Sequence, residues 1–172
     1  QEWDRFFARY GCNTPGANTI DHFATVARKH LCDGYNWAVS IDLKNAFGLL
    51  PKSAAVGPLA RLGFSDRAIE FIWRLVRIDS VERSSEQRFQ SMDLGIEQGN
   101  PLSALILNVA LSRSLLKLKN KHDIQILAFI DDIYLFAKTE AEATLAFKTF
   151  RSELKSKGFE NVLPHERAGD KR

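Results

Sequence analysis

The chain has 172 residues, of which 45% are hydrophobic and 26% are charged, and it includes 12 phenylalanines. This length suits one domain, or one domain with part of a neighbour, while the apolar content excludes a disordered chain and the formal charge of +3 permits nucleic-acid binding without requiring it. We find no signal peptide, no apolar run long enough to span a membrane and no metal-binding spacing around Cys12 or Cys32, so we expect a cytoplasmic protein with reduced thiols and no membrane partner.

The first part of the chain predicts two helices and then a strand. Residues 2–10 carry an aromatic stripe at helical spacing, and a loop of turn formers leads to a second helix at 20–30. Residues 37–42 form an apolar, strand-like run that ends on the carboxylate of Asp42. We expect residues 43–47 to be helical.

The middle of the chain predicts three more helices. Short amphipathic patterns cover 53–62 and 67–78, and the pattern over 81–94 is too weak to assign. A glycine-containing loop, 95–99, then precedes Asn100, a natural N-cap, and a long helix that starts at Pro101 and runs to about Lys119. Such a loop can approach a phosphate or a base closely, although on its own it is equally well explained as a helix cap.

The last part predicts a β-hairpin over residues 126–136, with Asp131 and Asp132 at its turn. An amphipathic helix follows over 140–154, and the polar residues from 161 onward show no finishing element. An ordinary hairpin often carries aspartate at its turn. The second strand that ends on Asp42 favours a metal-binding role for these aspartates instead. If the two strands are neighbours, three carboxylates converge and need a hard divalent cation such as Mg²⁺.

Three stretches in this order resemble the palm of reverse transcriptases. Ile41–Phe47 resembles the first palm motif, Gly95–Ser103 with Asn108 resembles the second, and Phe129–Asp132 resembles the aromatic-x-Asp-Asp signature. Residues 16–18 and the helix after them also resemble the fingers-to-palm segment of the group II intron, retron and defence-associated prokaryotic branch.

The resemblance implies an α+β fold. We expect an antiparallel sheet of three or four strands, with helices packed on one face and the acidic hairpin at its centre. Residues 1–35 would be part of the fingers and residues 36–172 the palm. The remaining fingers and the thumb would belong to a longer chain.

The resemblance also implies a metal site with two Mg²⁺ ions, for which Mn²⁺ can substitute. Asp42 and Asp131 would hold the ions, with Asp132 beside them and the backbone carbonyl of Leu43 completing a site. Phosphoryl transfer at two metals needs little covalent chemistry from the protein.

A nucleotide site is implied next to the metals, with Phe47 as the gate that excludes a ribose 2′-hydroxyl. The alternative for Phe47 is an ordinary core residue after a strand. Lys157, or Lys155, is the candidate general acid for pyrophosphate, although lysines at helix ends are more often simply solvated. The other residues implied to contact nucleotide or template are Asn45, Ala46, Gln98 and Gly99.

The leading hypothesis is an RNA-directed DNA polymerase that uses an RNA template, a DNA or RNA primer and dNTPs. Its setting could be intron mobility, a retron, CRISPR-associated spacer acquisition or antiphage defence in a prokaryote, and its oligomeric state stays open. The alternatives are a catalytically inactive palm that serves as a scaffold and an RNA-templated RNA polymerase, which Phe47 disfavours. A nucleotide cyclase would share the acidic hairpin but has no need of the loop at 95–99.

Overall fold

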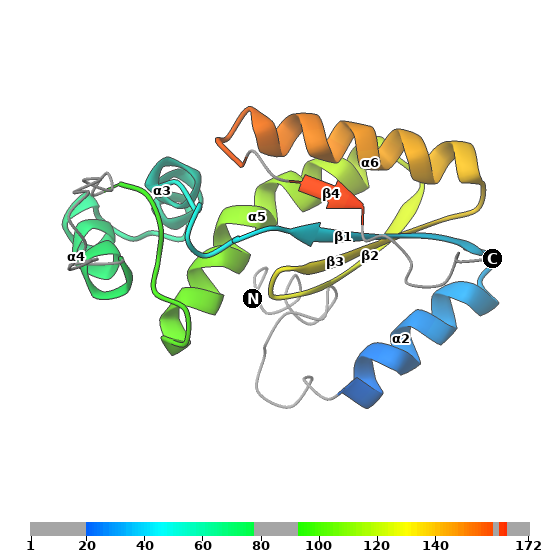
Figure 1. Ribbon diagram of the computed structural model, residues 1–172, viewed down its shortest axis with the longest axis horizontal. Coiled ribbons are helices and arrows are strands. Elements are labelled where there is room, and N and C mark those ends of the chain that lie inside the picture. Colours follow the sequence, from blue (N-terminus) through cyan, green and yellow to red (C-terminus); the bar gives the residue numbers. More distant parts are fainter. Residues whose placement is uncertain (1–19, 78–92, 160–161, 165–172) are drawn as a thin grey trace, which may run out of the picture.

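The computed structural model describes residues 20–77, 93–159 and 162–164 (Figure 1). The predicted helix at 2–10, the segment 16–18 and most of the weakly patterned stretch 81–94 lie outside these ranges. The elements in chain order are α2 (Ile20–Cys32), β1 (Trp37–Leu43), α3 (Lys52–Arg61), α4 (Asp66–Val76), α5 (Pro101–Lys121), β2 (Ile124–Phe129), β3 (Asp132–Ala137), α6 (Glu140–Lys155) and β4 (Val162–Pro164).

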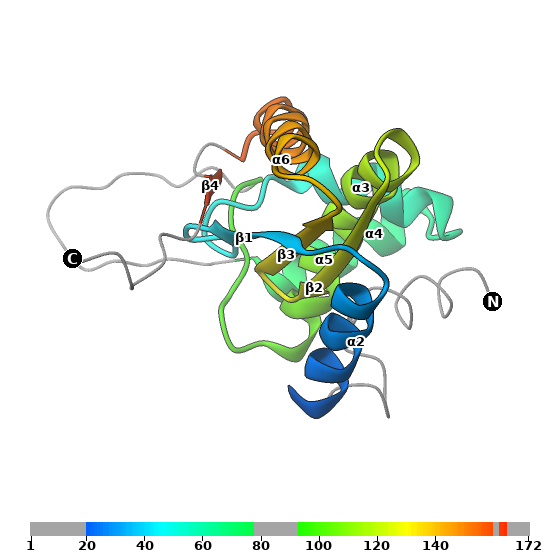
Figure 2. The ribbon, with the colours of Figure 1, turned by 90° about the vertical axis from the view of Figure 1, so that its right-hand side faces the viewer.

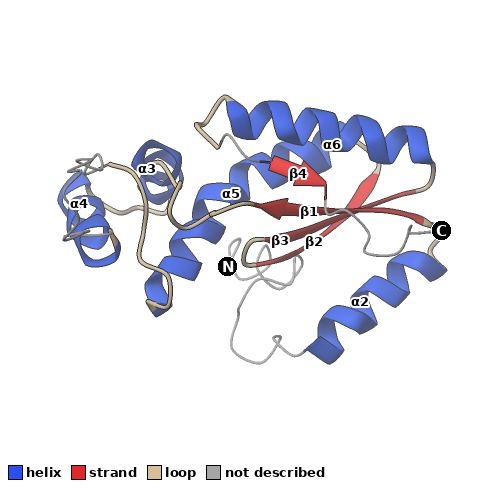
Figure 3. Cartoon of the chain, viewed as in Figure 1, coloured by secondary structure: helices blue, strands red, loops and turns tan. Residues whose placement is uncertain are grey.

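The described strands form one four-stranded antiparallel sheet in the order β2-β3-β1-β4. The predicted α+β fold class is confirmed, and the acidic hairpin β2-β3 lies directly beside β1. Strand β4 was not expected, because its three residues are too few to show a strand pattern. Helices α3 and α4 lie together beyond one end of the sheet (Figure 3).

One face of the sheet is covered by α5 and α6 (Figure 2). Alternate side chains of the strands, including Ile41, Ile133 and Leu135, point to this face and are fully buried with Phe150 of α6. Because successive strand residues point to opposite faces, the residues between them face the other way. This dense core is therefore the main source of apolar burial in the described chain.

The other face carries a smaller apolar cluster under α2. Leu127 of β2 and Phe136 of β3 are buried there with Tyr35, and Phe23 of α2 packs against them. The Phe23 ring meets Tyr134 edge to face, with centroids 5.2 Å apart. Thus α2 covers one part of a face that was expected to carry no helix.

Helix α5 is long and apolar enough, by composition, to cross a membrane, contrary to our expectation from sequence. However, 61% of its most apolar window is buried within the protein. Burial of this kind is typical of the central helix of a core.

Local signals account for most helix starts. Asn100 accepts a hydrogen bond from Leu102 N–H at 3.0 Å, as its N-cap role predicted. Thr139 and Glu142 form a capping box at the start of α6. The expectation of a helix at 43–47 was wrong, because Leu43 ends β1 and the chain then turns through residues 44–49.

Candidate active site

Asp42 and Asp132 occupy facing positions on neighbouring strands. The last paired residues given by the β1-β3 register are Ile41 and Ile133, and the two aspartates are the next residues toward the hairpin turn. Side chains at such positions share a face of the sheet, with Cβ atoms about 5 Å apart. Since Ile41 and Ile133 point into the helical core, both aspartates belong to the opposite, open face. Like charges placed in this way destabilise a sheet unless another charge compensates them.

Asp131 lies in the turn itself, next to a strained residue. The hairpin closes on the pair Phe129–Asp132, so Ile130 and Asp131 are the two central residues of the turn. Ile130 has a φ of 60°, which is rare for a β-branched residue and costs on the order of 1–3 kcal/mol. Backbone strain of this kind is concentrated at functional sites. The sequence pattern predicts both aspartates at the turn, whereas Asp132 is the first residue of β3.

The donor chemistry of this corner fits Mg²⁺. Carboxylates and a backbone carbonyl are hard oxygen ligands, and Mg²⁺ is usually bound by one or two carboxylates together with substrate phosphates. Across the ranges that the structure describes, no three His, Cys, Asp or Glu side chains are grouped to hold a metal by themselves. The three aspartates therefore do not form an all-protein cage, and substrate oxygens would have to complete the coordination.

The segment after β1 turns sharply beside these carboxylates. The Leu43 carbonyl accepts a hydrogen bond from Ala46 N–H at 3.0 Å, which closes the turn directly after β1. Asn45 is exposed and has a φ of 52°. A Cβ at Gly48 would lie 2.4 Å from the Asn45 side-chain oxygen, so a side chain there would displace Asn45.

Hydrogen bonds hold the loop at 95–99 next to this turn. The amide N–H of Ile96 donates to the Phe47 carbonyl at 2.8 Å, and that of Gly95 donates to the Leu50 carbonyl at 2.9 Å. Gln98 and Gly99 follow as an exposed turn, and Gly99 has a φ of 97° that favours glycine. The structure thus brings the two predicted nucleotide-contacting segments together.

Phe47 is half-buried and packs against the main core. It therefore combines a structural contact with remaining exposed surface. Ala46, by contrast, is buried, so only its backbone could meet a ligand.

Lys157 lies away from the carboxylates. Its ammonium is 3.8 Å from Glu153 of α6, and burial lowers the pKa of Lys157, with Lys117, Arg113 and Arg61 lowering it further. These neighbours belong to α5 and α6, which cover the helical face, and to α3, which lies beyond one end of the sheet. The structure does not bring Lys157 together with Asp42.

An antiparallel sheet with facing aspartates at an acidic hairpin, covered by helices on one face, is the architecture of a polymerase palm. The chain matches the family model for reverse transcriptase (RNA-dependent DNA polymerase) over residues 9–161. The match covers most of the chain, so the protein belongs to the reverse transcriptase family. A search among curated proteins found no match.

Two features of the site were missed from the sequence. No pattern predicts a positive φ at Ile130, because β-branched residues disfavour it. Strand β4 pairs Leu163 with Asp42, and the only signal for it is a short apolar pair within a polar stretch.

Proposed function

We propose that this chain is the palm of an RNA-directed DNA polymerase that adds deoxynucleotides to a primer 3′-end. The observation that carries the proposal is the β1-β3 register, which sets Asp42 opposite Asp132 on the open face with Asp131 in the adjacent turn. Membership of the reverse transcriptase family supports this assignment.

In this proposal Asp42, Asp131 and Asp132 would hold two Mg²⁺ ions, and the backbone carbonyl of Leu43 would be a further ligand. When bound, the ions lower the pKa of the primer hydroxyl and stabilise charge on the transferred phosphoryl and leaving groups. The fixed turn at Ile130 keeps Asp131 close to the strand ends, so that little rearrangement is needed when substrate arrives.

The reaction itself needs only positioning from the remaining residues. The primer 3′-oxygen forms a bond to the α-phosphorus of the dNTP as the bond to pyrophosphate breaks, and the hydroxyl proton passes to solvent. The exposed turn at Gln98 and Gly99 would contact the incoming nucleotide and the template. The backbone of Asn45 and Ala46 would face the triphosphate.

Phe47 would discriminate between sugars in this arrangement. The Phe47 carbonyl accepts a hydrogen bond from Ile96, so the position of the Phe47 ring is coupled to the loop that precedes Gln98. A bulky ring beside the sugar excludes a 2′-hydroxyl by clash, which selects deoxynucleotides. Lys157 is left out of the proposed centre because its neighbours lie among the helices.

The sequence resemblance extends the proposal to the biological setting. We place the activity in a prokaryotic cytoplasm, within a mobile element, a retron, a CRISPR-associated system or an antiphage defence system. Fingers and thumb regions of a longer chain would complete the enzyme.

Primer extension tests the proposal. The protein is given an RNA template, a labelled DNA primer, dNTPs and Mg²⁺ or Mn²⁺, and is compared with its Asp131→Ala, Asp132→Ala form. We expect extension by the parent and none by the variant, while Asp33→Ala, an exposed carboxylate after α2, leaves the rate unchanged. Equal extension by the parent and the double variant would refute the assignment, and no extension by either would favour a scaffold.

A further inference from the structure

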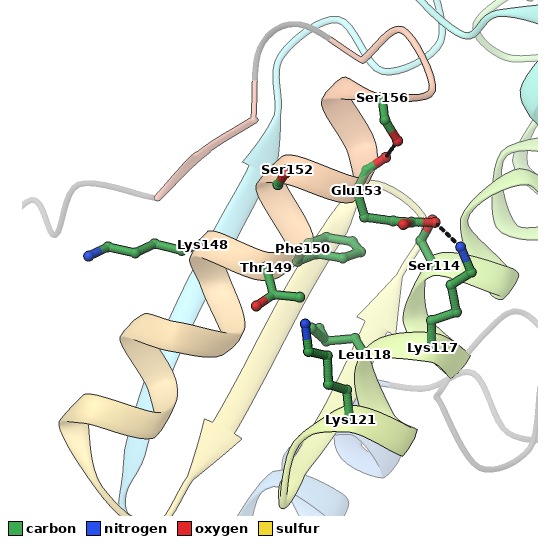
Figure 4. A pocket seen from close by; sticks show the side chains of 10 residues that line it. All are labelled: Ser114, Lys117, Leu118, Lys121, Lys148, Thr149, Phe150, Ser152, Glu153 and Ser156. Atoms are coloured by element: carbon green, nitrogen blue, oxygen red, sulfur yellow. Dashed lines mark hydrogen bonds and ion pairs between the residues drawn. The ribbon is translucent and has the colours of Figure 1, made fainter.

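A polar groove of about 500 Å³ lies between α5 and α6 (Figure 4). Its walls come from the C-terminal halves of the two helices, which pack against the sheet face opposite to Asp42. The groove is therefore a separate feature from the proposed active site. Its lining includes Lys117, Leu118, Lys121, Lys148, Thr149 and Ser152.

Positive charge exceeds negative charge in this groove. Glu153 is the only carboxylate among its lining residues, and its Oε1 accepts from Lys117 Nζ at 2.9 Å. Within the ranges that the structure describes, neither Lys121 nor Lys148 has an ion-pair partner. Figure 4 shows Lys121 reaching from α5 toward α6 at Thr149, whereas Lys148 extends from α6 on the side away from α5. The two ammonium groups thus flank α6, with that of Lys121 on its α5 side and that of Lys148 on its other side.

Further cations lie close to Glu153, next to the groove. The Nζ of Lys157 is buried, has no hydrogen-bond partner among the described residues and lies 3.8 Å from Glu153. Arg113 and Arg61 add to the positive potential at this point, since both lower the pKa of Lys157. A bound anion would reduce the mutual repulsion of these groups.

The residues that line the groove indicate which kind of anion it would bind. Lysine, serine and threonine are typical donors to phosphate oxygens and carry no base specificity. The apolar floor residues Leu118 and Phe150 are 2% and 0% exposed, so neither presents its side chain as an anchoring surface for a protein partner. The buried Phe150 ring likewise offers no stacking platform for a base.

We propose that the α5/α6 groove binds the phosphodiester backbone of a single nucleic-acid strand, independently of its sequence. The choice of nucleic acid rests on the proposed function, while the site lies on the other side of the sheet from the chemistry. It holds a segment of template or product that is remote from the reacting 3′-end.

The test compares two charge-reversal variants of the full chain. The groove variant is Lys121→Glu with Lys148→Glu, both at exposed positions. The control is Lys29→Glu with Arg67→Glu, which makes the same change of charge outside the groove. Lys29 lies in the last turn of α2, as Lys121 lies in the last turn of α5. Thermal melts verify that both variants are folded.

Binding is measured by fluorescence anisotropy with single-stranded RNA and DNA of the same sequence, over a range of salt concentrations. We expect the groove variant to lose about tenfold in affinity and to lower the salt slope by about 2, because each phosphate contact contributes about 1. The control variant should change the affinity and the salt slope less than the groove variant does. Loss with RNA alone identifies the template as the occupant, and loss with DNA alone identifies the product.

Two outcomes would overturn the inference. One is that the groove variant keeps the salt slope of the parent, or loses no more affinity than the control variant does. The other is poly-glutamate competing with the strand as effectively as unlabelled RNA does, with the same dependence on Lys121 and Lys148, which would assign the groove to an acidic peptide. Failure of the proposed function is seen separately, because extension of a short, saturating primer-template should be equal in the groove variant and the parent.

Discussion

The two faces of the sheet differ in what they contribute. The helical face buries alternate strand residues such as Ile41 and Leu135 completely against α5 and α6. The open face carries Asp42 and Asp132, with a smaller apolar cluster under α2. The helical face therefore supplies most of the folding stability. The like charges and the strained turn of the open face reduce that stability.

The first prediction separates chemistry from stability. Asp42→Asn should lower the primer-extension rate by on the order of 10³-fold, because it removes a ligand of the proposed metal centre. Its free energy of unfolding should stay the same or rise, since one of two facing charges is removed. Single-turnover incorporation and urea unfolding measure the two quantities. A variant that loses activity only because it unfolds would contradict this division.

The opposite behaviour is expected on the helical face. Phe150→Ala should lower the free energy of unfolding by about 3–5 kcal/mol, because a fully buried ring is replaced by a cavity. Leu145→Ala, on the same helix but 55% exposed, should change it by less than about 0.5 kcal/mol. Urea titrations at one pH compare them, and similar losses in both variants would show that α6 does not carry the core.

Phe47 connects the two faces, since it packs on the core and adjoins the loop at 95–99. Phe47→Val should raise incorporation of ribonucleotides relative to deoxynucleotides by about 10- to 100-fold, the scale of a steric selection. The ratio of kcat/KM for the two substrates measures the change. A core role alone would lower stability and leave the ratio as it was.

The strain at Ile130 predicts a small change in stability. Ile130→Gly should alter the free energy of unfolding by less than about 1 kcal/mol, because relief of the positive φ offsets the lost contacts. Ile133→Ala, in the unstrained core, should cost about 2–4 kcal/mol. If the two substitutions were equally costly, the turn would not be strained.

The smallest effect concerns pH. The hydrogen bond from Lys117 lowers the pKa of the Glu153 carboxyl from its ordinary value of 4.5. The pair therefore stabilises the fold above that pH, and the stabilisation is lost as the pH falls through the lowered pKa. Lys117→Met should cost about 0.5 kcal/mol at pH 7 and progressively less toward pH 3. A difference that grew on acidification would contradict the assigned pair.

Local chemistry made much of the fold predictable from sequence. Asn100 followed by Pro101 marks the start of α5, and the apolar runs around the paired aspartates mark the hairpin. The order of the motifs also indicated the family. Strand β4 escaped prediction because pairing with β1, rather than its own pattern, defines it.

Tertiary context decided what the sequence could not show. The amphipathic pattern of α2 predicts that it packs, but not that it packs on the open face. The pattern of the hairpin places Asp131 and Asp132 next to each other, whereas the register alone sets Asp132 opposite Asp42. The position of Lys157 among α3, α5 and α6 depends on long-range packing.

The central claim is that the open-face carboxylates form one metal centre. Electron paramagnetic resonance of Mn²⁺, titrated into the full protein with primer-template and dNTP, tests it most directly. We expect tight Mn²⁺ binding by the parent and by Asp33→Asn, and its loss in both Asp42→Asn and Asp132→Asn. Mn²⁺ binding that is unchanged by either substitution would contradict the account.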